Sequence, residues 1–193
     1  MRYFNIPDSS LDSTRQMFRD LENDIRDTKI DLGIGIYRDE KGEAPVFKAV
    51  KKAESILYQN EKSKSYKTPA GNSEYCKNIL DLVLGKTILN ERKHKVGAIQ
   101  IPGAGSGLRI AGELIKNNLQ NKLISIPNPT WGQQPFMFEK AGLKISKYTY
   151  YNQQNNFLDF NHMIDDLNKL KSGDSLLLHG CCHNPTGADL SLD

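Results

Sequence analysis

Three clusters of residues along this chain have the residue types of a ligand site. The first is Gly103-Ala104-Gly105-Ser106-Gly107, which follows a short apolar run and precedes a helical pattern. A strand, a glycine-rich turn and a helix start present backbone N–H groups and a partial positive charge, and both suit an anion such as phosphate. Ser106 adds a hydroxyl donor. A tight turn that binds nothing is the alternative.

Sharper phosphate motifs do not fit this glycine-rich segment. No Gly-Lys-Ser/Thr follows it, and the positions two away from Ser106 are Ala104 and Leu108 rather than the glycines of a hydrolase elbow. A dinucleotide fingerprint is only half met, because the next apolar run ends in Ile126-Pro127-Asn128-Pro129 without an acidic residue for the ribose. A nucleotide-binding oxidoreductase is therefore the weaker alternative.

The second cluster is Asn128-Pro129-Thr130-Trp131, which contains the only tryptophan of the chain. An indole just past the end of a strand can stack on a flat ring. The alternative is a tryptophan buried in the core or in an interface. The Asn128-Pro129 bond also fits a cis peptide in a tight turn.

The third cluster runs from His179 to Gly187 and reads HGCCHNPTG. Two histidines and two cysteines suggest zinc, but structural zinc sites usually space their cysteines two to four residues apart. Cys181 and Cys182 are adjacent, and neighbours on an extended segment point to opposite faces. No metal is therefore expected, whereas Asn184 offers both a donor and an acceptor to a ligand.

Regular elements must position these clusters. Apolar residues at helical spacing predict helices over residues 18–25, 46–57, 73–83, 108–115, 134–141 and 160–170. Alternating or short apolar runs predict strands over residues 30–37, 96–101, 123–126, 143–151 and 176–178. Strand–helix alternation is typical of an α/β fold with a parallel or mixed sheet. Such sheets bind ligands just beyond the carboxyl ends of their strands, where the three clusters fall.

Composition narrows the class of protein. The chain has 193 residues, and 26 Lys plus Arg against 23 Asp plus Glu give a net charge of +3, too little to indicate nucleic-acid binding. Three cysteines, two of them adjacent, do not form a disulfide framework and indicate a reducing compartment. No apolar run approaches the ~20 residues of a spanning helix, so we expect a cytoplasmic protein without a membrane partner.

Taken together, the motifs resemble the aspartate and aromatic amino acid aminotransferases, class I and fold type I enzymes that use pyridoxal 5'-phosphate (PLP). The residues that carry the resemblance are DLGIGIYRDE at 31–40, KKAE at 51–54, NPTW at 128–131 and HGCCHNPTG at 179–187. The resemblance implies a mixed, mostly parallel sheet flanked by helices and incomplete at the C-terminus. It also implies an N-terminal arm over 1–12, a segment of the small domain over 13–44 and the first half of the large PLP-binding domain over 45–193.

The resemblance further implies a role for each matched residue. Trp131 matches the tryptophan stacked on the pyridine ring, and Asn184 matches the asparagine that hydrogen-bonds the phenolic oxygen of the ring. Gly35 matches a glycine at the amino-acid substrate, which Trp131 and Asn184 also border. Tyr66 matches a tyrosine that reaches the cofactor phosphate of the neighbouring subunit, which implies a homodimer. The expected phosphate loop consists of Gly103, Ala104, Gly105 and Ser106.

The sequence departs from the family pattern in places. Gly105 stands at the usual threonine of the phosphate loop, and Gln134 stands where a histidine is frequent. The Schiff-base lysine of the family follows HNPTG and is expected beyond residue 193, so no catalytic residue is assigned in this chain.

The implied reaction moves an amino group from aspartate or an aromatic amino acid to a 2-oxo acid. We expect this chain to be a truncated part of such an enzyme and inactive alone. A non-catalytic fragment or decayed gene product is the alternative. Open strand edges also predict poor stability or aggregation.

Overall fold

The computed structural model describes residues 13–31, 33–92 and 95–191. The chain forms two compact units, residues 1–65 and 66–193, and each is described by itself. The predicted N-terminal arm over 1–12 lies outside the described residues. The predicted boundary between the small and large domains, after residue 44, stays a prediction.

The described residues of the first unit include two helices, α1 (Ser13–Asn23) and α2 (Lys48–Asn60). No residue of α2 is buried, so the apolar stripe that predicted this helix stays exposed. The predicted strand over 30–37 is wrong. Asp31 instead makes local bonds, accepting one from the Gly33 N–H at 2.9 Å and pairing with Arg38 at 2.7 Å. Such side-chain bonds compete with strand pairing. Leu32 lies outside the described residues.

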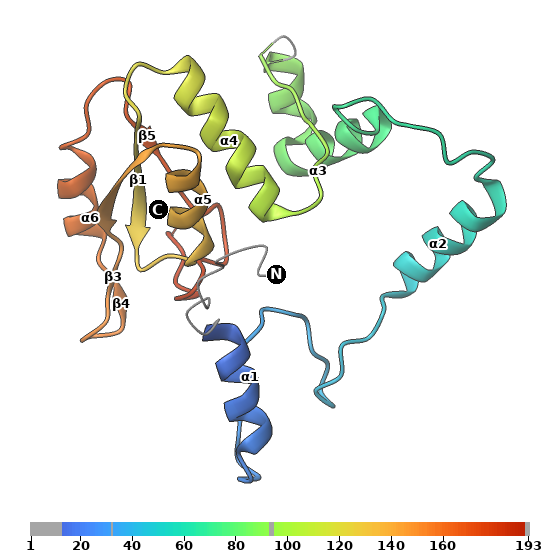
Figure 1. Ribbon diagram of the computed structural model, residues 1–193, viewed down its shortest axis with the longest axis horizontal. Coiled ribbons are helices and arrows are strands. Elements are labelled where there is room, and N and C mark those ends of the chain that lie inside the picture. Colours follow the sequence, from blue (N-terminus) through green and yellow to red (C-terminus); the bar gives the residue numbers. More distant parts are fainter. Residues whose placement is uncertain (1–12, 32, 93–94, 192–193) are drawn as a thin grey trace, which may run out of the picture. The chain divides into compact units, whose positions relative to one another are not determined.

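A three-stranded parallel sheet forms the centre of the second unit (Figure 1). Its order is β2-β1-β5, with β1 at Leu123–Asn128, β2 at Lys144–Thr149 and β5 at Ser175–Leu176. Four consecutive residues of β1 are buried, as expected for the central strand of a parallel sheet. A short antiparallel hairpin follows β2 and consists of β3 (Tyr151–Asn152) and β4 (Phe157–Leu158).

Helices lie on both faces of this sheet. One core cluster packs Ile124 and Ile126 of β1 against Phe138 of α5 (Gln133–Lys140), with α4 (Ala104–Asn118) beside it. A second cluster packs Tyr148 of β2 against Met163 of α6 (Phe160–Leu167). Ile145 belongs to the first cluster and Tyr148 to the second, and alternate residues of a strand point to opposite faces. Figure 1 accordingly shows α6 on one side of β1 and α4 and α5 on the other.

The remaining element of this unit is α3 (Ser73–Arg92), which contains a kink at Gly85, where φ is +72°. The predicted strand over 96–101 is wrong, because this stretch pairs with no strand among the described residues. The Gln100 N–H instead bonds the Ala70 carbonyl at 2.9 Å. Gly142 ends α5 with φ at +88°, which confirms the predicted helix stop.

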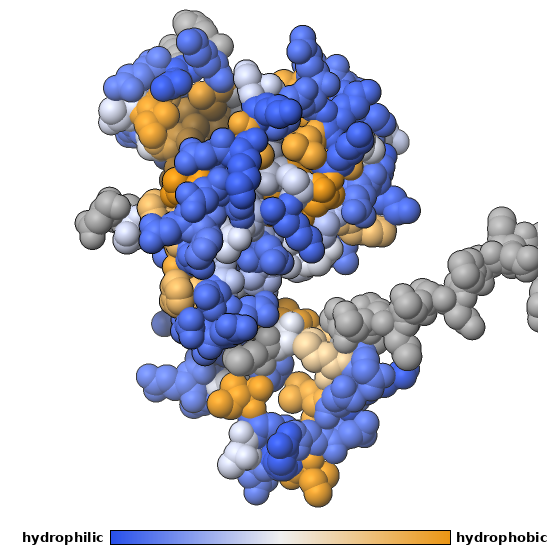
Figure 2. All heavy atoms as spheres, turned by 90° about the vertical axis from the view of Figure 1, so that its left-hand side faces the viewer, coloured by the Kyte–Doolittle hydropathy of each residue, from blue (hydrophilic) through white to orange (hydrophobic). Residues whose placement is uncertain are grey.

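Many apolar side chains lie at the surface, and Figure 2 shows them interspersed with hydrophilic ones. Neither α2 nor α3 buries a residue. Among the described residues, no helix is long and apolar enough to cross a membrane.

Candidate functional site

Two of the predicted clusters lie at one end of the parallel sheet. The Asn128–Trp131 segment begins at the last residue of β1, and the His179–Gly187 segment follows shortly after β5. Because β1 and β5 are neighbouring parallel strands, their carboxyl ends meet at the same edge. The Asn128-Pro129 and Asn184-Pro185 bonds are both cis. The sequence had suggested a cis bond at Asn128-Pro129, and this is confirmed. The N-terminal end of α4 lies toward this same end of the sheet (Figure 1).

Gln134 and His179 connect these two segments. Gln134 is buried at the start of α5, and its Oε1 accepts a hydrogen bond from the Thr130 hydroxyl. The same oxygen lies 3.1 Å from Nε2 of His179. Nδ1 of His179 accepts a bond from the backbone N–H of Asn184 at 3.1 Å. A chain of hydrogen bonds therefore runs from beside Trp131 to the backbone of Asn184.

Aromatic stacking holds the His179–Gly187 segment in place. The rings of His179 and His183 are stacked at 4.3 Å, and the ring of His183 is stacked on Tyr150 at 3.9 Å. Burial lowers the pKa of His179, and burial together with the neighbouring His179 lowers the pKa of His183. Both imidazoles are therefore favoured in the neutral form.

Asp189 holds the backbone of the same segment. Its carboxylate accepts bonds from the N–H groups of Cys182 at 2.7 Å and His183 at 2.8 Å, and these bonds lower its pKa. The Tyr150 hydroxyl donates to the Ala188 carbonyl at 2.7 Å. These contacts fix the turn in which Cys182 adopts a φ of +50°. Across the described ranges, no cluster of three or more His, Cys, Asp or Glu side chains is arranged to hold a metal ion.

The structure places the remaining predicted residues as follows. Gly103 precedes α4 with φ at +107°, and Ala104, Gly105 and Ser106 form the first turn of that helix. Trp131 is half-buried, and Asn184 is exposed. Tyr66 is fully exposed at the start of the second unit.

Gly35 belongs to the first unit, where it is exposed and a Cβ built on it meets nothing within 4 Å. Tyr150 and Asp189 also hold the carboxyl end of the sheet in place, although no sequence motif predicted them. Neither belongs to a motif, and each acts through a contact that only folding creates.

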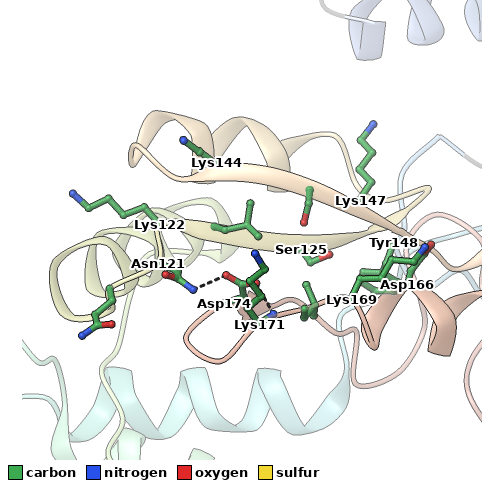
Figure 3. A pocket seen from close by; sticks show the side chains of 14 residues that line it. Asn121, Lys122, Ser125, Lys144, Lys147, Tyr148, Asp166, Lys169, Lys171 and Asp174 are labelled. Atoms are coloured by element: carbon green, nitrogen blue, oxygen red, sulfur yellow. Dashed lines mark hydrogen bonds and ion pairs between the residues drawn. The ribbon is translucent and has the colours of Figure 1, made fainter.

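A cavity of about 720 Å³ lies elsewhere, at the amino ends of the strands. Lys122, Lys144 and Asp174, which line it, lie at or just before the starts of β1, β2 and β5. Figure 3 shows Lys122, Lys144 and Lys147 pointing in different directions, and Lys169 pairs with Asp166 at 2.7 Å. Ligands of parallel α/β sheets bind at the opposite end, so we assign no chemistry to this cavity.

The residue types at the carboxyl end of the sheet suit a flat, anionic ligand. The N-terminus of α4 and the Ser106 hydroxyl suit a phosphate, the half-buried indole of Trp131 suits an aromatic ring, and the exposed Asn184 amide suits a ring oxygen. These residues fit PLP, which has all three features.

Comparison with known proteins identifies the family. The sequence model of Aminotransferase class I and II matches residues 27–193. The aspartate aminotransferase of Escherichia coli is 40% identical over 172 residues, which are 88% of this chain and 43% of that protein. The aromatic-amino-acid aminotransferase of Pseudomonas aeruginosa is 40% identical over 171 residues, 89% of this chain and 43% of that protein.

Among solved structures, an aromatic-amino-acid aminotransferase of Burkholderia pseudomallei covalently bound to pyridoxal phosphate has a TM-score of 0.90 and 28% identity. It covers 99% of this chain, which covers 48% of it. The fold predicted from the motifs is thus confirmed, and the chain spans less than half the length of these relatives. The chain belongs to the class I and II aminotransferase family.

Proposed function

We propose that this chain carries the cofactor-binding end of a PLP-dependent aminotransferase that moves an amino group from aspartate or an aromatic amino acid to a 2-oxo acid. The observation that carries the proposal is the placement of Trp131 and Asn184 on segments that follow neighbouring parallel strands and are joined through Gln134 and His179. Membership of the aminotransferase family supports it.

Each residue of this end then has a defined task. The backbone N–H groups at the start of α4 and the Ser106 hydroxyl bind the phosphate. Trp131 stacks on the ring and fixes its plane, while the Asn184 amide donates to the ring oxygen. When bound, PLP supplies an electron sink for carbanion chemistry. The residues of this chain bind and orient; none of them is assigned the proton transfer.

Substrate and subunit contacts complete the proposal. We assign Gly35 to the amino-acid substrate and Tyr66 to the phosphate of a neighbouring subunit in a homodimer. The full exposure of Tyr66 agrees with a side chain that is available to a partner. Three free cysteines support a cytoplasmic, reducing location.

Titration with PLP tests the proposal, because Trp131 is the only tryptophan and its fluorescence reports on this site alone. We expect saturable quenching that is weakened in the Ser106→Ala and Asn184→Ala variants. Borohydride trapping followed by peptide mapping separates this binding from imines formed on surface lysines. Quenching that never saturates, or that both variants leave unchanged, contradicts the assignment.

We expect no transamination by this chain alone, since no lysine in it matches the Schiff-base position of the family. An assay with aspartate, tyrosine and 2-oxoglutarate tests this expectation. Turnover that persists in repurified protein free of host aminotransferase contradicts it. PLP binding without turnover fits the proposal, whereas the absence of both favours the alternative of a non-catalytic fragment or decayed gene product.

A further inference from the structure

We propose that Gln134 and His179 are positioning residues that clamp the Trp131 segment to the Asn184 segment, with His179 held as the neutral imidazole that carries its proton on Nε2. What the two segments bind rests on the proposed function. The clamp itself is argued from contacts within the second unit.

The backbone decides the tautomer of His179. The Asn184 N–H has only one hydrogen to give, and it points at Nδ1 from 3.1 Å. An imidazole nitrogen accepts a hydrogen bond only when it carries no proton of its own. The neutral ring must therefore carry its proton on Nε2, and a doubly protonated ring would lose the bond to Asn184.

The tautomer in turn decides the orientation of Gln134. Both amide atoms of this side chain lie close to His179 Nε2, with Nε2 at 3.0 Å and Oε1 at 3.1 Å. Only Oε1 can accept the His179 proton, and the same oxygen accepts from the Thr130 hydroxyl. Gln134 thus accepts from Thr130, four residues before it in the sequence, and from His179, 45 residues after it.

Burial makes this arrangement costly to break. Gln134 is 9% exposed, so removing its carbonyl oxygen leaves two donors without a partner. The charged and titratable groups around His179 are few. His183 stacks on it, Asp189 acts on it through charge, and Tyr150 stacks on the far face of His183. Cys181 and Cys182 lie in the same turn and are exposed.

Nitrogen NMR of 15N-histidine-labelled full chain tests the tautomer without any cofactor. The chain has four histidines, so substituting each one in turn assigns its signals. At neutral pH we expect His179 Nδ1 to show the shift of an unprotonated nitrogen and Nε2 that of a protonated one. A ring protonated on Nδ1, or on both nitrogens at neutral pH, overturns the proposal.

Trp131 fluorescence then tests the clamp, again without cofactor. Gln134→Leu removes the acceptor, and we expect a shifted emission maximum. Gln133→Leu is the matched control, because Gln133 is the adjacent, exposed glutamine, and it should leave the emission unchanged. Gln134→Glu keeps an oxygen that can accept from both Thr130 and His179, so it should restore the emission. Its negative charge should also raise the pH at which His179 titrates. The clamp is overturned if Gln134→Leu and Gln133→Leu change the Trp131 emission equally. It is also overturned if Gln134→Glu does not raise the pH at which His179 titrates.

PLP titration connects the clamp to the proposed function. Gln134→Leu should weaken PLP binding about three- to tenfold, an effect of the size that a typical hydrogen bond contributes, because the two segments are no longer held in position, while Gln133→Leu leaves it unchanged. If the unsubstituted chain binds PLP and neither variant binds it more weakly, the positioning role is overturned. If the unsubstituted chain binds no PLP, the proposed function fails, whereas the NMR and emission results still decide the clamp.

Discussion

The imidazole of His183 is stacked on the phenol ring of Tyr150, with ring centroids 3.9 Å apart and 13° between the planes. His183 is 1% exposed, and Nε2 of this ring has no hydrogen-bond partner among the described residues. Its Nδ1 lies 2.8 Å from the Thr186 hydroxyl. The HNPTG segment is therefore anchored by the buried stack of His183 on Tyr150, the residue that follows β2.

The two stacked histidines should make stability depend on pH. Their pKa values are lowered by burial, so below about 6.5 the unfolded chain binds more protons than the folded one. The contribution of these two histidines to the free energy of unfolding is therefore fully present above about pH 6.5 and is lost as the pH is lowered. Urea unfolding at pH 7.5 and pH 5 measures the difference. This window lies above the range in which the carboxylates titrate.

His162 acts with the opposite sign and provides the control for that experiment. Its hydrogen bond with Asp159 raises its pKa, so its contribution is present below about 6.5 and is lost as the pH rises. A His162→Gln variant removes this opposing effect and should enlarge the loss at pH 5. If the His162→Gln variant is as stable as the unsubstituted chain at pH 5, or more stable, the prediction is contradicted.

Two phenylalanines of α5 provide a matched pair for the core. Phe138 is 2% exposed and packs against β1, whereas Phe136 is 48% exposed on the same helix. Phe138→Ala should lower the free energy of unfolding by about 3–5 kcal/mol through lost burial and a residual cavity. Phe136→Ala should cost less than about 1 kcal/mol. Denaturant titration measures both, and similar losses would show that α5 does not pack as described.

Two glycines of α4 should respond oppositely to alanine. A Cβ at Gly112 would lie 2.7 Å from the Cβ of Ala141, so α4 and α5 would have to separate. Gly112→Ala should therefore cost about 1–3 kcal/mol. At Gly105 the nearest atom to a built Cβ is Met137 Cε at 3.6 Å, an ordinary contact, and alanine favours a helix. Thermal melts of both variants test this, and a Gly112→Ala protein as stable as Gly105→Ala would refute it.

Asp166 ties α6 to β2 and should contribute only where it is ionised. Its carboxylate accepts from Lys169 Nζ at 2.7 Å and from the Thr149 N–H at 2.8 Å, and these bonds lower its pKa. The contribution is present above about 3.9 and is lost as the pH falls below it. Asp166→Asn should cost about 1 kcal/mol at pH 7, and the exposed Asp165→Asn should cost almost nothing. A deficit that persists unchanged at pH 2 would contradict this reading.

Exposed apolar residues should make the chain self-associate. Neither α2 nor α3 buries a residue, and Val50, Leu57 and Leu82 are all exposed large side chains. Large apolar side chains left exposed on a helix can form interaction sites or cause aggregation. Sedimentation should show association that rises with concentration and weakens in a Val50→Lys, Leu57→Lys variant. A monomer at every concentration would argue against it.

Local pattern was sufficient for most elements of the second unit. Leu123 to Ile126 is a short apolar run, and Gly142 takes the positive φ that ends α5. The same reasoning failed over 30–37 and 96–101, although both stretches alternate or are apolar. A strand forms only when a second strand satisfies its N–H and C=O groups, and sequence alternation does not report that partner.

The sequence by itself determined the family, through motifs that resemble those of known aminotransferases, and it named the candidate residues, because residue types and spacing indicate a ring stacker, an amide and a helix start. Tertiary structure alone decided that Gln134 and His179 join the segments of Trp131 and Asn184, and that Tyr150 supports His183. Those contacts link residues 33 to 45 positions apart in the chain. Their geometry depends on the order β2-β1-β5 and on burial, which no local pattern encodes.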